Sequence, residues 1–442
     1  MKARLATWWF DLRDTLWPIP AAMAAAAIAL ALLLVQVDQA LLAQQGEHRW
    51  WMFSGGAAGA RGVLAAIAAT SMTVATMAFS ITIVALQLGS NQYSPRILRS
   101  FTGDRGNQVV LGIFVATFVY ALVVLRVIRA NSDDTRTFVP GIAVTMGIVL
   151  AFVMIGALIY FFHHATHNIQ AGVILDRATS DTRQLIEGEQ DRRAGMTLVR
   201  RSLPDLAGAD RRVEADSAGY LQNIDVPLLV RAATQWGGIV RVSRTEGQFL
   251  LAGATLATLW PSDPASSAEN PDPADSLLDT VRSAFIVGME RTLERDIKFG
   301  YRQISDIALK ALADFNDPTT STFCIDRLGE LLHLSMDLRS GTYEIRDDDD
   351  VVRVRIDLEG FETYLGIAFD QIRHHGAADM TVMLHLLEML HTLAERTEDP
   401  AIRQHIERMA QLTVEEIGFQ SLPEADQLRM LAAAVWAVPA PF

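Results

Sequence analysis

A line of small polar side chains runs through one of the most apolar stretches of the sequence. Its members are Thr73, Thr76, Ser80, Gln87 and Asn91, whose spacings bring them close to one face of a helix. Hydroxyl and amide groups can replace the water around a permeating ion, so the pattern predicts a pore lining. The same groups can instead let helices pack closely and form hydrogen bonds with one another. In either case the polar face is expected to contact water or protein rather than lipid, where polar groups are unfavourable.

A basic cluster of Arg96, Arg99 and Arg105 follows this line. Pro95 lacks a backbone N–H and restricts the residue before it, so the helix is predicted to end near Ser94. The three arginines can form a cytoplasmic vestibule that attracts anions. They can equally anchor the helix end to lipid headgroups.

Three histidines form another group whose spacing permits chemistry. His163 and His167 are four residues apart, a spacing at which two imidazoles on one helical face can bind a metal ion, and His164 lies between them. No carboxylate or thiol follows nearby, so a pH-sensitive contact and simple solvation of a helix end are alternatives. Solvation of a helix end is the commoner role of such histidines, so the sequence predicts no metal site, with His163 and His167 as the only candidates, and no bound cofactor.

Residue patterns typical of enzymes are absent from the sequence. It has no Ser-His-Asp order, phosphate-binding GxxxxGK[ST] loop, Rossmann glycine pattern, GxSxG elbow or HExxH helix. Its single cysteine, Cys324, excludes an intrachain disulfide framework and a CxxC metal site. The sequence therefore predicts a protein that is not an enzyme.

The elements that must position these residues are four runs without charge, at 17–37, 62–90, 107–125 and 138–162. A hydrocarbon core of about 30 Å needs roughly 20 apolar residues in a helix, so each run is predicted to cross a membrane. The composition agrees, because 50% of the 442 residues are apolar and only 20% are charged. Asp38 is expected to end the first span.

Basic residues favour one orientation of the four spans. An even number of spans places both termini on one side, where basic residues flank spans one, two and four. The positive-inside rule then predicts that both termini lie in the cytoplasm and that the chain is a multi-pass protein of the bacterial inner membrane.

Charge divides the chain into two unequal parts. The net charge of −13 combines +4 over residues 1–167 with −17 over residues 168–442. The acidic balance argues against a nucleic-acid partner. The expected partners are the lipid bilayer, further copies of the chain in a homo-oligomer, and an ion or small ligand.

The acidic part shows both strand and helix patterns. Short apolar alternations separated by glycine predict a small β-rich module at 196–260, with a short helix at 226–236. Helices are predicted at 277–315, from Asp317 as N-cap and Pro318 as first residue, and from 358 to the end with a break at 397–400. Strands at 343–345 and 351–356 are predicted to form a hairpin.

The expected fold class is a membrane α-helical part with four transmembrane helices, followed by an α+β cytoplasmic region that is mostly helical. The expected division is a four-span domain at 1–167, a connecting helix and β-rich module at 168–262, a flexible linker at 263–276, and a mainly helical domain with a β-hairpin at 277–442.

Charged residues also crowd the stretch that begins the last of these domains. Its members can build a buried ionic network or form solvated pairs along one helix, and they are Glu290, Arg291, Asp296, Arg302 and Asp306.

Four stretches distributed over the chain are distinctive in combination. They are FSITIVALQLGSNQYSPRILRSF, DRGNQVVLGIFVATFVYALVVLR, IYFFHHATHNIQ, and ERTLERDIKFGYRQISDIALKAL with NDPTT after it. Together they resemble a bacterial family of predicted membrane proteins catalogued as a domain of unknown function. The resemblance extends over nearly the whole chain and implies four N-terminal spans and a cytoplasmic C-terminal part. It implies no substrate, cofactor or catalytic residue, and Ala313 and Asp314 stand where the family usually has Ser-Pro.

These observations predict an oligomeric ion channel or pore lined by the second span, with a cytoplasmic part that assembles or regulates it. The alternative is a membrane-anchored sensor or scaffold without transport activity.

Overall fold

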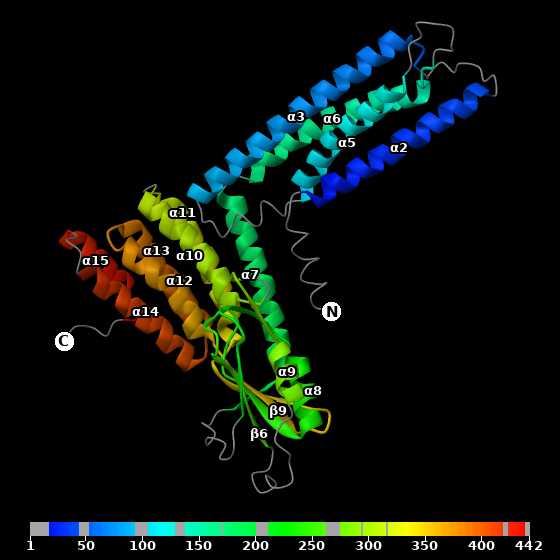
Figure 1. Ribbon diagram of the computed structural model, residues 1–442. Coiled ribbons are helices and arrows are strands. Elements are labelled where there is room, and N and C mark those ends of the chain that lie inside the picture. Colours follow the sequence, from blue (N-terminus) through cyan, green and yellow to red (C-terminus); the bar gives the residue numbers. More distant parts are fainter. Residues whose placement is uncertain are drawn as a thin grey trace. The chain divides into compact units, whose positions relative to one another are not determined.

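The computed structural model describes residues 17–43, 53–92, 105–128, 138–168, 171–199, 211–261, 275–292, 295–314, 317–418 and 423–437. It divides into two compact units, Met1–Val173 and Ile174–Phe442. Figure 1 shows the helical first unit and the mixed second unit.

The first unit contains four long helices, α2 (Pro18–Ala43), α3 (Ala57–Gln92), α5 (Arg105–Val127) and α6 (Gly141–Asn168). Each includes a stretch that is long and apolar enough to cross a membrane, which confirms the four predicted spans. Helix α5 packs against the other three helices of this unit. Gly112 of α5 faces Met23 of α2 at close range, because small residues let membrane helices approach one another.

Asp38 lies in the last turn of the first span, which runs from Pro18 to Ala40, close to the predicted end. Its carboxylate is 3% exposed and accepts hydrogen bonds from the backbone N–H groups of Ile142 and Ala143, each at 3.0 Å. These groups belong to the first turn of α6, where no acceptor exists within the helix itself. Asp38 therefore caps α6 from a neighbouring helix, and the positive end of the helix dipole favours its charge.

Substituting alanine for Asp38 should lower the stability of the membrane unit by about 1–3 kcal/mol, because two buried N–H groups lose their acceptors. The thermal unfolding midpoint of the full chain in detergent measures this loss. Asp38→Asn keeps one acceptor oxygen and should lose less. An unchanged midpoint in Asp38→Ala would show that water or lipid headgroups replace the cap.

The second unit contains a six-stranded sheet in the order β1-β8-β9-β4-β6-β2. Only β4 and β9 pair in parallel, and the other neighbours are antiparallel. Its strands are β1 (Thr197–Val199), β2 (Arg211–Glu214), β4 (Gly238–Val242), β6 (Thr255–Pro261), β8 (Gly341–Arg346) and β9 (Val352–Leu358).

A smaller sheet has the order β5-β3-β7, with β3 at Gly219–Ile224, β5 at Phe249–Leu250 and β7 at Phe285–Gly288. Residues of both sheets share one buried core, in which Leu221 and Val240 are fully enclosed.

The predicted hairpin is confirmed, and it belongs to the large sheet. Val240 of β4 pairs with Val354 of β9, so strands from 168–262 and from 277–442 form one structure. The sequence separates these regions into two domains, whereas the structure holds them in one compact unit. Most of the linker expected at 263–276 lies outside the described residues.

The continuous helix expected over 277–315 is wrong, because a strand interrupts it. The structure has α9 at Asp275–Ser283, β7, and then α10 at Ile297–Asp314. The run Phe285-Ile286-Val287 is apolar and rich in residues that favour strands, and it pairs with β3. Pairing with a neighbouring strand thus overrides the helical pattern on either side.

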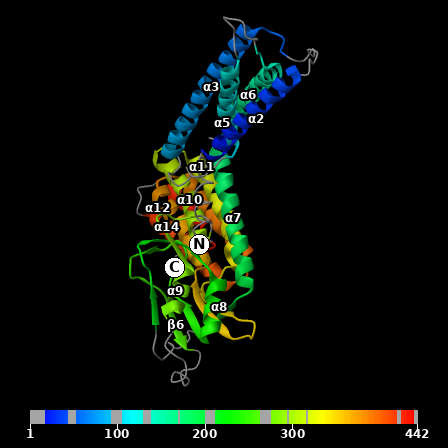
Figure 2. The same cartoon turned by 45° about the vertical axis from the view of Figure 1, so that its right-hand side comes forward.

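Helices cover the remainder of the second unit, as Figure 2 shows from a second direction. Asp317 caps α11 by accepting from the backbone N–H of Thr320 at 3.1 Å, with Pro318 as the first helical residue, which confirms both assignments. The helices are α7 (Ala171–Ala194), α8 (Val226–Trp236), α11 (Pro318–Leu334), α12 (Phe361–Gly376), α13 (Met380–Arg396), α14 (Pro400–Gly418) and α15 (Glu424–Ala433).

Candidate functional site

The predicted polar line lies on the outer face of α3. Thr73, Thr76, Ser80 and Gln87 are all exposed, so they do not face the other spans of the same chain. Asn91 lies in α3, but its side chain is outside the described residues. The structure therefore keeps four of the five predicted residues on a common surface.

The hydroxyl groups of this line donate their protons to the helix that carries them. Thr73, Thr76 and Ser80 each donate to the carbonyl oxygen four residues earlier, at 2.9 Å. A hydroxyl has one proton and two lone pairs. Since the proton is used inside α3, the oxygen lone pairs are what this surface offers to a neighbouring group.

Side-chain size distinguishes this surface from the outer faces of the other spans. Helix α6 exposes branched and aromatic side chains, with Phe152 at 69% and Ile159 at 67%. Helix α2 exposes Leu32 and Leu33. On α3, five bulky residues are also exposed, namely Met72, Met77, Phe79, Ile83 and Val84. Up to Ser80 the centre of the line consists of small or polar residues, namely Gly62, Ala66, Ala69, Thr73, Thr76 and Ser80.

The other predicted membrane sites are only partly described. Arg105 is exposed at the first position of α5, and Arg96 and Arg99 lie outside the described residues. His163 is exposed, and the ring of His164 stacks on Tyr160 at 5.2 Å. The His167 side chain is not described, and no group of three metal-binding side chains occurs in the described part of the chain.

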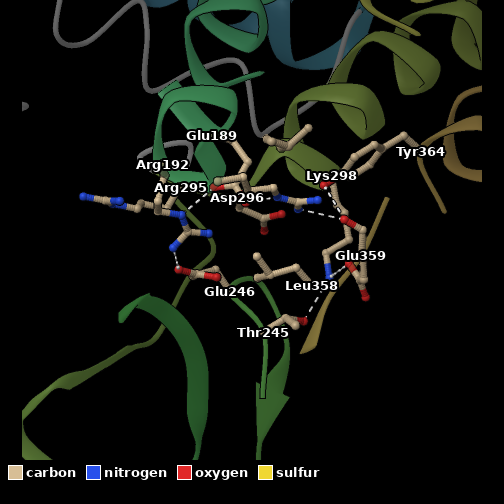
Figure 3. Close-up of a pocket in the computed structure, with 12 residues that line it drawn as sticks. Glu189, Arg192, Thr245, Glu246, Arg295, Asp296, Lys298, Leu358, Glu359 and Tyr364 are labelled. Carbon is tan, nitrogen blue, oxygen red and sulfur yellow. Dashed lines mark hydrogen bonds and ion pairs between the residues drawn. The ribbon is translucent and has the colours of Figure 1, made fainter. Parts of the chain in front are cut away.

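A second site is a charged pocket in the second unit, drawn in Figure 3. Its cavity of about 30 Å³ has room for a few water molecules. It lies between the end of α7, the loop from β4 to β5, the start of α10 and the segment after β9. The residues that line it are Glu189, Arg192, Arg193, Thr245, Glu246, Arg295, Asp296, Ile297, Lys298, Leu358, Glu359 and Tyr364.

Glu189 of α7 occupies the centre of the ion pairs in this pocket. Its two carboxylate oxygens pair separately with the Nε atoms of Arg192 and Arg193, each at 2.6 Å. Arg192 also reaches Glu246, at 3.3 Å. The side chains of Glu189 and Arg193 are 10% and 8% exposed, so solvent screens this pair little.

Arg193 continues from Glu189 to the base of the hairpin. Its guanidinium donates to the carbonyl oxygens of Arg339, at 3.0 Å, and Glu359, at 2.8 Å. These carbonyls precede β8 and follow β9. The same guanidinium lies over the Tyr343 ring, at 5.3 Å from its centre. Arg193 thus fastens both ends of the hairpin to α7.

Helix α10 contributes a parallel set of contacts. Lys298 pairs with Glu359 at 2.6 Å and donates to Thr245 at 3.4 Å. Asp296 pairs with Arg291 at 2.6 Å, and burial raises the pKa of the Asp296 carboxyl although Arg291 opposes that effect. A side chain at Gly247 would collide with Asp296, and its φ of 84° also favours glycine.

The charged stretch predicted from the sequence divides between two environments. Asp296 and Arg291 form the buried pair, whereas Arg302 and Asp306 form a pair at 3.1 Å along α10. Sequence reasoning missed Glu189, whose neighbours three and four positions later are both arginines. That spacing predicts ion pairs along a helix, but the contacts of the two arginines with distant loops depend on the fold.

Comparison with known proteins agrees with the architecture. A family described as predicted membrane proteins (DUF2254) matches residues 13–392. An uncharacterized protein of Mycobacterium tuberculosis strain H37Rv is 33% identical over 397 residues, covering 87% of this chain and 73% of the relative. An uncharacterized protein of Mycobacterium bovis shows the same identity and coverage. No solved structure matches. With four apolar helices at its N-terminus and a match over most of its length, the chain belongs to the DUF2254 family of predicted membrane proteins.

Proposed function

We propose that this membrane protein assembles from several copies into an ion channel whose pore is lined by α3. The observation that carries the proposal is the exposed line of Thr73, Thr76, Ser80 and Gln87 on an outer face of the bundle. Polar groups at such a position are unfavourable against lipid. One helix cannot enclose a path, so further copies of the chain must supply the remaining wall.

The expected permeating species is a cation, which favours the headgroup-anchoring role of Arg96, Arg99 and Arg105 over the anion-attracting one. Three hydroxyl groups of the line direct their protons into α3 and leave acceptor oxygens on the surface. Oxygen atoms without a proton to offer replace the hydration of a cation better than that of an anion. Gln87 adds an amide, which can both donate and accept.

The proposal places the channel in the bacterial inner membrane with both termini in the cytoplasm. The excess of basic residues on that side supports this orientation. The second unit then serves as a cytoplasmic part that assembles or regulates the pore. The proposal includes no catalytic step, no cofactor and no nucleic-acid partner.

Thiol modification tests whether water reaches the line. Cys324 is fully buried, so a cysteine introduced at Thr76 should be the accessible thiol of the protein. A cationic, water-soluble methanethiosulfonate reagent should react with Thr76→Cys in the membrane and block ion current across planar bilayers. Ile155 of α6 is 50% exposed on a bulky face, and Ile155→Cys should resist the reagent because lipid covers it.

Equal reactivity of the two cysteines, or no reactivity at Thr76→Cys, would contradict the proposal that α3 lines a pore. So would the absence of current from purified wild-type protein that is correctly assembled.

The alternative, a membrane-anchored sensor or scaffold without transport, has support from the same hydrogen bonds. Because each hydroxyl proton is already satisfied within α3, the surface of small side chains can also pack directly against protein. This alternative predicts that the assembled protein produces no ion current in planar bilayers. It also predicts that Thr76→Cys forms disulfides between copies.

A further inference from the structure

Helix α7 is attached to the second unit along its length. It begins at Ala171, shortly after α6 ends at Asn168. Thr182 lies against Gly300 of α10 so closely that a larger residue at Gly300 would not fit. Gln190 donates to the carbonyl oxygen of Leu334 at 2.6 Å. The helix that follows the last span is therefore an integral part of the second unit.

The end of α7 contacts the loop that joins the two sheets and the hairpin of the large sheet. Arg192 reaches Glu246 in the loop that leads to β5 of the small sheet. Arg193 reaches the carbonyl oxygens at both ends of the hairpin, which belongs to the large sheet. One carboxylate, Glu189, holds both guanidinium groups in place.

We propose that Glu189 is a coupling residue through which α7, and with it the chain leading from the last membrane span, is fastened to both sheets. Breaking this carboxylate's two ion pairs frees the end of α7 from the loop at 243–248 and from the hairpin base, while its chain connection to β1 and the fold of the rest of the second unit are kept. We call Glu189, Arg192 and Arg193 the junction. A conformational change in the sheets is transmitted to α7 through the junction, and this transmission is lost when the two ion pairs are broken.

The release is local because α10 holds the same two segments independently. Lys298 binds Glu359 next to the hairpin and Thr245 in the loop, and neither contact involves α7. Removing one partner from a largely buried ion pair leaves the other charge unpaired, so Glu189 is the sensitive position. The loop and the hairpin should remain bound to α10 when their contacts with α7 are broken.

Hydrogen exchange of the full chain in lipid nanodiscs tests the inference. Glu189→Gln should raise exchange by at least about tenfold near 190–199, in the loop at 243–248 and at the hairpin base. Arg192→Gln should affect the loop and not the hairpin base. Arg193→Gln should affect the hairpin base and not the loop. Glu187→Gln, an exposed change on the same helix, should leave all three regions unaltered.

Two results would overturn the inference. If Glu189→Gln and Glu187→Gln exchange alike, the ion pairs do not fasten α7. If the three substitutions at the junction raise exchange equally throughout α12, α13 and α14, they act by general destabilisation and α7 has no separate coupling role.

A second readout deepens the proposed function and rests on it. In bilayer recordings, Glu189→Gln should change the fraction of time the channel is open and leave the single-channel conductance unchanged, because the pore lining is intact. Failure of the pore proposal would remove this readout but not the exchange result. Channels with altered opening and unaltered exchange would contradict the coupling role.

Discussion

Substituting lysine for Thr76 should reduce cation current by at least about a hundredfold. Thr76 lies between Thr73 and Ser80 on the exposed polar line of α3. In the proposed pore every subunit would place an ammonium group in the path. Two like charges about 4 Å apart repel by about 4 kcal/mol at an effective dielectric constant of about 20. Single-channel recording in symmetrical potassium or sodium solutions measures the effect.

The companion variant is Thr76→Val, which keeps the size of the side chain and removes its acceptor oxygen. It should conduct less than the wild type but far more than Thr76→Lys, and its preference for cations over anions should fall. Gel filtration in detergent checks that both variants assemble. An assembled Thr76→Lys protein with undiminished cation current would exclude Thr76 from the conduction path and favour a packing role for the line.

Substituting alanine for Gly360 should destabilise the second unit by about 1–3 kcal/mol or more, as overpacking typically does. A Cβ atom at this position would collide with the backbone nitrogen of Ser340 and the carbonyl oxygen of Leu338. Backbone atoms cannot rotate away as a side chain can. The backbone N–H of Phe361 also donates to the Leu338 carbonyl at 2.9 Å, so moving the two segments apart breaks that bond.

The matched control for this substitution is Gly188→Ala. Gly188 lies on α7 with no neighbouring atom within 4 Å of an added Cβ, so alanine should stabilise the helix by up to about 1 kcal/mol. Thermal unfolding of the full chain in detergent, followed by tryptophan fluorescence, should therefore shift in opposite directions for the two variants. If Gly360→Ala unfolds at the same temperature as the wild type, the backbone at the hairpin base can move to accommodate the added Cβ atom.

Local patterns were sufficient to predict much of the fold. The length of the apolar runs predicts all four spans, since bilayer thickness sets the required length. The order Asp317-Pro318 predicts the start of α11, because the cap and the fixed proline geometry act within one turn. The hairpin follows from strands on either side of a polar turn.

Features that depend on distant partners could not be predicted in the same way. From the sequence, Asp38 is expected only to end a span. Its carboxylate can be buried because the N-terminus of α6 supplies two backbone N–H groups as hydrogen-bond donors. The strand β7 is four residues long, too short for a periodic pattern, and its pairing with β3 decides its conformation. Glu189 gains its central place through Arg193, whose guanidinium contacts segments that follow far along the chain.

The candidate site in the membrane shows the same distinction. Helical periodicity predicts that Thr73, Thr76, Ser80 and Gln87 share a face, and the structure agrees. Periodicity alone does not say whether that face meets the spans of the same chain. The packing of α3 against α5 and α6 decides this, because it uses the opposite side of the helix.

The parallel pairing of β4 with β9 has a consequence for biosynthesis. Arg241 and Asp357, which lie on these two strands, are 116 residues apart in the chain. Strands β4 and β6 must therefore wait for the hairpin to leave the ribosome before the large sheet can close. By then all four spans have been delivered to the membrane, so the nascent second unit stays tethered to them with unfinished strand edges. Such edges bind other unfolded chains readily, and holdase chaperones should engage this protein late in its synthesis.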